Sequence, residues 1–183
     1  MIEKAKSRRG FLTMGLGAAA ATLLTTCPVE AAIRRLPERS LHLYNTHTGE
    51  TLKSVYWAEG RYQPKTIAQI SRFLRDHRNG SVHAIDPRLL DLMVSVQHKV
   101  GGKGAVHIIS GYRSPASNAI LASYSDGVAT HSLHMEGKAV DIRIPGHNLR
   151  HVGRAAKSLR AGGVGIYPDS DFVHIDTGRV RTW

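Results

Sequence analysis

The sequence predicts an α+β fold organised as a single domain, and three observations support this prediction. Apolar side chains recur every three or four residues across 64–80 and 87–100, which is the period of an amphipathic helix. Beyond residue 104 the pattern changes to short apolar segments separated by polar clusters, which is typical of strands. These segments are residues 105–109, 139–144, 164–167 and 172–175. Residues 40–183 show no break in composition, so we expect one core.

The domain is predicted to begin with a hairpin and two helices. Turn-forming residues at 45–50 separate two alternating apolar stretches, which indicates the hairpin. Pro64 opens the first helix, and Gly80 is expected to end it. Asp86 caps the second helix, which Gly101 ends. Two shorter helices are predicted later, one after Ser114-Pro115 and one over residues 149–159.

The first 31 residues are predicted to be an export signal that precedes the domain. Basic side chains open the segment, an uncharged stretch follows at residues 10–26, and small residues stand at Ala31 and Ala32. Residues 7–12, Ser-Arg-Arg-Gly-Phe-Leu, match the twin-arginine consensus, whose translocon exports folded proteins. We therefore expect a domain over residues 32–183 and a periplasmic location. No uncharged apolar run reaches about 18 residues, so no stable membrane span is expected.

Cys27 leaves a second interpretation of this segment open. Leu24 stands three positions before it, as in the pattern of a lipid-modified cysteine, although Thr26 directly before Cys27 argues against that pattern. If cleavage follows Ala31, the mature chain keeps no cysteine. That outcome suits an oxidising compartment and excludes catalysis by a thiol.

The mature chain is expected to be strongly basic. The full sequence carries a formal net charge of +11, of which the first 31 residues contribute +2, so the remainder keeps +9. In an exported bacterial protein this charge favours attraction to the cell-wall polymer or to anionic lipid headgroups. The basic residues are scattered and no basic run is interleaved with aromatics, so no nucleic-acid partner is expected.

Histidine and carboxylate side chains gather in the second half of the sequence, in residues 131–141 and 171–176. The polar segment 110–114, Ser-Gly-Tyr-Arg-Ser, precedes them. Neutral imidazole nitrogen and anionic carboxylate oxygen are donors that bind Zn²⁺ at about 2.0–2.2 Å. The alternatives are a polar cluster without an ion and a zinc site kept only for structure.

The alternation of side chains between the two faces of a strand indicates which of these residues can meet. Apolar residues take one face of the strand over 139–144, which leaves Asp141 on the other face. In the strand over 172–175, His174 likewise projects opposite its apolar neighbours, on the same side as Asp176. Asp141 and His174 can therefore face one cleft if the two strands are neighbours. His134 precedes Asp141 by an odd number of residues, so a bend, for which Gly137 is suited, must bring it back.

These residues carry a family resemblance. The pattern Ser132-x-His134-x-x-Gly137-x-Ala139-x-Asp141, with His174 after it and Ser110-Gly-Tyr112-Arg113-Ser114 before it, resembles the zinc peptidases of the lysostaphin, D-Ala-D-Ala carboxypeptidase and hedgehog group. The similarity covers roughly residues 105–178. Within that group the chain is most similar to a twin-arginine-exported branch of periplasmic murein endopeptidases, through residues 46–50 and 176–183 as well.

The resemblance implies a small antiparallel sheet that carries a zinc site and is flanked by helices. It implies that His134, Asp141 and His174 bind one Zn²⁺ and leave a fourth position for water, which is the catalytic pattern. The enzyme would hydrolyse peptide cross-links between peptidoglycan stem peptides, and we expect a monomer. Which cross-link it cuts, D-Ala to diaminopimelate or diaminopimelate to diaminopimelate, stays open.

The resemblance also assigns roles around the metal. Asp171 stands three residues before His174, where the family places its general base, whereas strand parity favours Asp176. We favour Asp171 as the base and Asp176 as a support for His174. Arg113 is expected to bind a substrate carboxylate or the oxyanion, because its planar guanidinium group can donate two parallel hydrogen bonds to a carboxylate. Ser132 is expected to contact substrate.

Two other functions are compatible with the same residues. A carboxypeptidase or dipeptidase would use the same zinc chemistry on free stem-peptide ends and would need a cation, such as Arg113, for the terminal carboxylate. A non-catalytic peptidoglycan-binding module would keep a vestigial zinc site. His131 lies three residues before His134 and could contact substrate, while Glu136 lacks the His-Glu-x-x-His spacing of helical zinc proteases.

Overall fold

The computed structural model describes Val29, Ile33, residues 36–125 and residues 127–183. The predicted export signal and Cys27 therefore lie outside the described residues, apart from Val29, and stay predictions. Ile33 is fully buried in the core, and Val29 is buried there as well. Among the described residues, no helix has both the length and the apolar character needed to cross a membrane.

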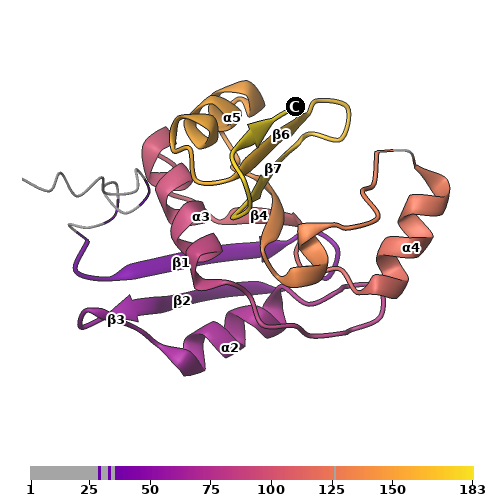
Figure 1. The fold of residues 1–183 in the computed structure, drawn as a ribbon. Coiled ribbons are helices and arrows are strands. Elements are labelled where there is room, and N and C mark those ends of the chain that lie inside the picture. The colour runs from indigo at the N-terminus through magenta and orange to yellow at the C-terminus, as the bar shows by residue number, and fades with distance from the viewer. Residues whose placement is uncertain (1–28, 30–32, 34–35, 126) are drawn as a thin grey trace, which may run out of the picture.

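One mixed sheet of eight strands organises the described chain (Figure 1). The spatial order is β3-β2-β1-β4-β5-β7-β6-β8. The strands are β1 (Arg39–Asn45), β2 (Thr51–Ala58), β3 (Arg61–Tyr62), β4 (Val106–Ser110), β5 (Ala139–Arg143), β6 (Gly163–Tyr167), β7 (Phe172–Asp176) and β8 (Arg181–Thr182). The helices are α2 (Pro64–Phe73), α3 (Pro87–Val100), α4 (Pro115–Tyr124) and α5 (Leu149–Ser158), with a 3₁₀ turn η1 (Leu133–Glu136).

This architecture confirms the α+β class, and it refines the expected small antiparallel sheet. The part that carries the predicted site, β4-β5-β7-β6, is antiparallel throughout. The pairs β1–β4 and β6–β8 are parallel, so the full sheet is larger and mixed. These two pairs join segments distant in sequence, which local alternation cannot reveal.

Helix α3 follows its sequence signals from end to end. The Asp86 carboxylate accepts a hydrogen bond from the Arg88 amide, and Pro87 opens the first turn. Gly101 ends the helix in the left-handed conformation, with φ of 73°. Most of the helix is buried, and it packs against α5 and β1 to form the centre of the core. Figure 1 shows α3 between the first strands and α5.

Helix α2 is shorter than predicted, because it ends at Phe73 and not at Gly80. The residues after it form a turn around Asp76, whose side chain is fully buried. The Asp76 carboxylate accepts hydrogen bonds from the amides of Arg78 and Ser114. These bonds compete with continuation of the helix, and they attach the turn to the segment that carries Arg113.

Candidate metal centre

The pairing of β5 with β7 places two of the predicted ligands opposite each other. In this antiparallel pair Asp141 faces His174 directly. Directly opposed residues of an antiparallel pair project from the same face of the sheet, so both side chains reach the same space. The parity prediction for these two strands agrees with this register.

The 3₁₀ turn η1 brings the third predicted ligand, His134, to the same place. The Ser132 hydroxyl accepts a hydrogen bond from the His134 amide at 3.4 Å and so caps the turn. Gly137 ends the turn with φ of 64°, and an added Cβ there would collide with the carbonyl oxygen of Ala84. The bend expected at Gly137 therefore exists, as a turn before β5, and both its backbone angle and its close contact require glycine.

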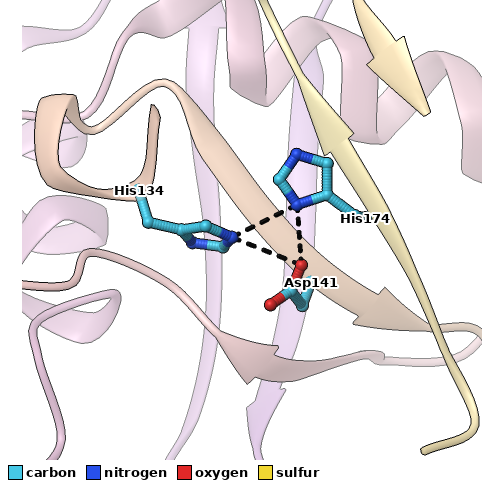
Figure 2. Close-up of side chains that lie close together, drawn as sticks. All are labelled: His134, Asp141 and His174. Carbon is cyan, nitrogen blue, oxygen red and sulfur yellow. Dashed lines mark hydrogen bonds and ion pairs between the residues drawn. The ribbon is translucent and has the colours of Figure 1, made fainter. Parts of the chain in front are cut away.

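The three side chains point toward one another from η1, β5 and β7, as Figure 2 shows. His134 Nε2 lies 3.2 Å from His174 Nδ1 and 3.3 Å from Asp141 Oδ1. His174 Nδ1 lies 2.9 Å from the same Asp141 oxygen. Ligand atoms at the corners of a zinc tetrahedron stand about 3.3 Å apart, given bonds of about 2.0–2.1 Å. The triangle therefore has close to the size that one such ion requires.

The outer nitrogen of each imidazole has a partner that defines the tautomer. His134 Nδ1 lies 2.7 Å from the Gly111 carbonyl oxygen, which can only accept, so this nitrogen carries the proton. His174 Nε2 lies 3.0 Å from Asp176 Oδ2 and donates to that carboxylate. In the neutral rings the two inner nitrogens then present lone pairs to each other and to Asp141. Three inward-facing acceptors in buried surroundings are a site for a cation.

Burial and neighbouring charges shift the pKa values of these groups in opposite directions. Burial raises the pKa of the Asp141 carboxyl, but the charge and hydrogen bonds of His134 and His174 outweigh burial and hold the pKa below its usual range. Burial lowers the pKa of His174, and its hydrogen bonds to Asp141 and Asp176 more than compensate, so the net direction is upward. A metal ion must therefore displace a proton that His174 tends to hold.

Asp176 has no exposed surface and lies behind His174. Besides the imidazole, its carboxylate accepts hydrogen bonds from the amides of Gly163 and Gly178 and from Arg181 Nη2 at 2.8 Å. Burial raises the pKa of Asp176, but these donors, with His174 foremost, hold it below the usual range. The carboxylate is thus an ionised acceptor for His174 Nε2–H.

Asp171 lies apart from this cluster. It stands in the turn before β7 with φ of 51°, and its side chain is 61% exposed. Its carboxylate pairs with Arg143 Nε at 2.8 Å, and its backbone carbonyl accepts from the same nitrogen. Asp171 does not border the cavity at the metal centre. In this position the carboxylate is held by Arg143 and is not among the side chains that border the cavity.

Arg113 lies beside the metal centre, as the resemblance implied. Its guanidinium Nη2 is 3.9 Å from Asp141 Oδ2, and Nη1 donates to Asn118 Oδ1. The side chain is only 11% exposed, and its buried Nε has no hydrogen-bond partner among the described residues. Burial lowers the pKa of Arg113, although a guanidinium stays charged at any ordinary pH.

A cavity of about 440 Å³ opens onto the three candidate ligands. The cavity is bordered by Arg113, Ser132 and His131, the three residues that the sequence suggested as substrate contacts. Further residues on its wall were not assigned a role from the sequence, namely Tyr167, Phe172, Arg181 and Trp183. Tyr167 and Phe172 reach the cavity from β6 and β7, whereas the contact of Arg181 and Trp183 with the site depends on the parallel pairing of β8 with β6, for which the sequence offers no local signal.

Comparison with known proteins adds the family context. A family model described as Peptidoglycan L,D-endopeptidase MepK matches residues 34–183. The peptidoglycan L,D-endopeptidase MepK of Escherichia coli strain K12 is 42% identical over 177 residues, with 97% of each chain covered. The probable peptidoglycan L,D-endopeptidase MepK of Haemophilus influenzae is 38% identical over 179 residues, covering 97% of this chain and 96% of the relative.

Proposed function

The chain belongs to the family of the peptidoglycan L,D-endopeptidase MepK, and on this premise we propose that it is a zinc-dependent endopeptidase that hydrolyses peptide cross-links in peptidoglycan. The family membership makes it a metallopeptidase that acts on peptidoglycan. The observation that carries the proposal for zinc is the triangle of His134 Nε2, Asp141 Oδ1 and His174 Nδ1, with sides of 2.9–3.3 Å. A set of two imidazoles and one carboxylate is typical of catalytic zinc, which retains one open position.

The residues present fit zinc in both chemistry and spacing. When bound, zinc supplies Lewis-acid polarisation of the scissile carbonyl and lowers the pKa of water to about 7. The chain's own contribution is to hold the three donor atoms in place. Gly111 and Asp176 keep the two imidazoles in the tautomers that leave an inner nitrogen free.

Arg113 is proposed to bind the negative charge of the substrate or of the oxyanion. Its guanidinium borders the cavity within 3.9 Å of Asp141, and its Nε has no hydrogen-bond partner in the described part of the chain. A cross-linked peptide places a carboxylate on the carbon next to the scissile amide nitrogen. A guanidinium that already lies beside the metal centre can receive this carboxylate without reorganisation.

His131 is proposed as the proton acceptor. Among the described residues that border the cavity, His131 carries the one imidazole outside the three candidate ligands. Asp171, which the family spacing favours, would first have to leave Arg143. Asp176 is engaged with His174 and has no exposed surface, so we assign it the role of orienting that ligand.

The name of the relatives suggests the cross-link. An L,D-endopeptidase cuts a bond between an L-centre and a D-centre, and the diaminopimelate–diaminopimelate link has this stereochemistry. We propose this link as the substrate. The alternative link, D-Ala to diaminopimelate, joins two D-centres.

Digestion of purified muropeptides tests the function. We expect the zinc-loaded protein to convert diaminopimelate-linked dimers into monomers and to leave uncross-linked monomers intact. Loss of terminal alanine alone would instead identify a carboxypeptidase, and unchanged dimers would identify a binding module. His131→Ala and Asp171→Asn variants separate the two possible bases, because the true base should lower kcat by about 10²-fold or more while zinc content stays near one per chain.

The export route is also a proposal. We propose that residues 1–31 direct the folded domain, residues 32–183, to the periplasm as a monomer through the twin-arginine pathway. A reporter protein fused after residue 32 should be exported, and replacing Arg8 and Arg9 by lysine should retain it in the cytoplasm. Export of the lysine variant would contradict the proposal.

A further inference from the structure

A tryptophan on the cavity wall has no role in holding the metal. Trp183 borders the cavity, and 48% of its surface is exposed. It lies beside Tyr167 and Phe172, whose rings stack with centroids 4.6 Å apart. Together these three side chains form an aromatic wall, which comes from the β6–β7 hairpin and the segment after β8.

The indole of Trp183 is held in a defined position. Its Nε1 donates a hydrogen bond to the Tyr167 hydroxyl oxygen at 2.7 Å. Its backbone amide donates to the Val164 carbonyl, and its carbonyl accepts from the Ile166 amide. Between these two residues, Gly165 leaves room for the ring, since a Cβ there would lie 2.5 Å from the indole. Strand β6 therefore accommodates the ring only because residue 165 has no side chain.

This position is next to the reaction centre. The indole ring lies 5.3 Å from the His174 ring, measured between centroids. The Arg181 guanidinium lies 5.0 Å from the indole centroid, within the range of a cation–π contact. The indole thus extends the aromatic wall of a cavity that also presents the metal ligands and the guanidinium groups of Arg113 and Arg181. A large apolar side chain left half in water at such a place is typical of a ligand contact.

We propose that Trp183 is a substrate-binding residue, whose indole packs against the aliphatic chain of the diaminopimelate residue next to the scissile bond. This inference rests on the proposed function, which supplies the stem peptide as ligand. Diaminopimelate combines a run of methylene groups with charged ends. The methylene groups match the indole face, and a carboxylate end matches the cationic side of the cavity at Arg113.

Kinetics on a cross-linked dimer test the proposal. We expect Trp183→Ala to raise KM about tenfold, equivalent to about 1.4 kcal/mol, with kcat changed less than threefold and zinc content unchanged. Trp183→Phe should recover much of the loss. The matched control is Val180→Ala, an exposed residue near the same strand that does not border the cavity, and it should keep the wild-type KM. An unchanged KM in Trp183→Ala overturns the proposal, and so does a loss of zinc from this variant that accounts for its reduced activity.

A binding measurement separates failure of this proposal from failure of the proposed function. Trp57 and Trp183 are the two tryptophans of the chain, so Trp57→Phe leaves Trp183 as the sole indole reporter. In zinc-free protein, which should not hydrolyse the peptide, adding the dimer should change the Trp183 emission and reach saturation. Trp183→Phe, which retains Trp57, should show no saturable change. If the Trp183 emission does not change on adding the dimer, the inference is overturned even if the enzyme cleaves dimers. If the emission changes and no dimer is cleaved, only the endopeptidase function is overturned.

Discussion

Each imidazole of the metal centre is oriented by a group outside the ligand set. For His134 this group is a backbone carbonyl, that of Gly111, and for His174 it is the carboxylate of Asp176. The difference matters for mutagenesis, because only the second partner is a side chain. Asp176 is also the acceptor for Arg181, so removal of its charge affects both neighbours.

Asp176→Asn should therefore weaken zinc binding more than it weakens the fold. We expect zinc affinity to fall about 10–100-fold, the usual effect of losing a hydrogen-bond partner of a metal ligand. Competition with a chelator measures the affinity, and thermal unfolding with and without zinc measures the contribution to stability. Equal zinc affinity in variant and wild type would show that Asp176 does not orient His174.

The upward direction of the His174 pKa predicts how metal binding depends on pH. The second proton of the charged imidazole, which Asp141 stabilises on His174 Nδ1, must leave before zinc binds, while the Nε2 proton stays with Asp176. Zinc affinity should therefore decrease as the pH falls below that raised pKa, by about tenfold per pH unit for one displaced proton. Calorimetry in buffers of different ionisation enthalpy counts the released protons, and a release of none below that pKa would contradict this prediction.

At the scale of elements, the turn η1 depends on one glycine. Gly137 has φ of 64°, and an added Cβ would collide with the Ala84 carbonyl. Gly146 offers a matched control, because it has φ of 80° with nothing within 4 Å of an added Cβ. Both substitutions to alanine incur backbone strain of about 1 kcal/mol, but only the first must also move η1 and His134.

Gly137→Ala is thus expected to lose zinc and activity, while Gly146→Ala loses only stability. The free energy of unfolding should fall by about 1 kcal/mol in Gly146→Ala and by clearly more in Gly137→Ala. Denaturant unfolding and zinc content per chain are the measurements. Full zinc occupancy in Gly137→Ala would show that η1 tolerates the displacement.

At the scale of the whole molecule, Asp76 connects the end of α2 to the segment that carries Arg113. Its carboxylate is fully buried. Burial raises its pKa, but hydrogen bonds from the Ser117 hydroxyl and from the amides of Ser114 and Arg78 lower the pKa to about 2. Because the folded pKa lies below the unfolded value, Asp76 stabilises the fold above about pH 4, and this contribution is lost as the pH falls to about 2.

Asp76→Asn should remove this pH dependence. We expect the variant to be less stable at neutral pH by about 2 kcal/mol and to lose less stability than the wild type between about pH 4 and pH 2. Chemical denaturation at several pH values measures both quantities. Asp141 and Asp176 also titrate in acid, so the comparison with the wild type, and not the slope alone, isolates Asp76. Parallel curves would contradict the prediction.

Much of the site could be predicted because its chemistry follows local patterns. The sequence itself gives the imidazole and carboxylate donors of His134, Asp141 and His174. The alternation of apolar and polar residues along two strands indicated that Asp141 and His174 project from one face of the sheet, as the register shows. Turn signals likewise predicted the ends of α3. Such patterns depend on backbone geometry within a few residues, which is the range over which a sequence specifies structure directly.

The sequence by itself determined which side chains could hold a metal and on which strand faces they lie. The tertiary structure decided what surrounds them: the Gly111 carbonyl behind His134, Trp183 on the cavity wall, and Asp171 beside Arg143 instead of beside the metal centre. The physical reason is that these contacts join segments that meet only through strand order and turn geometry. Periodicity fixes the face from which a side chain projects, whereas long-range packing chooses the neighbour that it meets there.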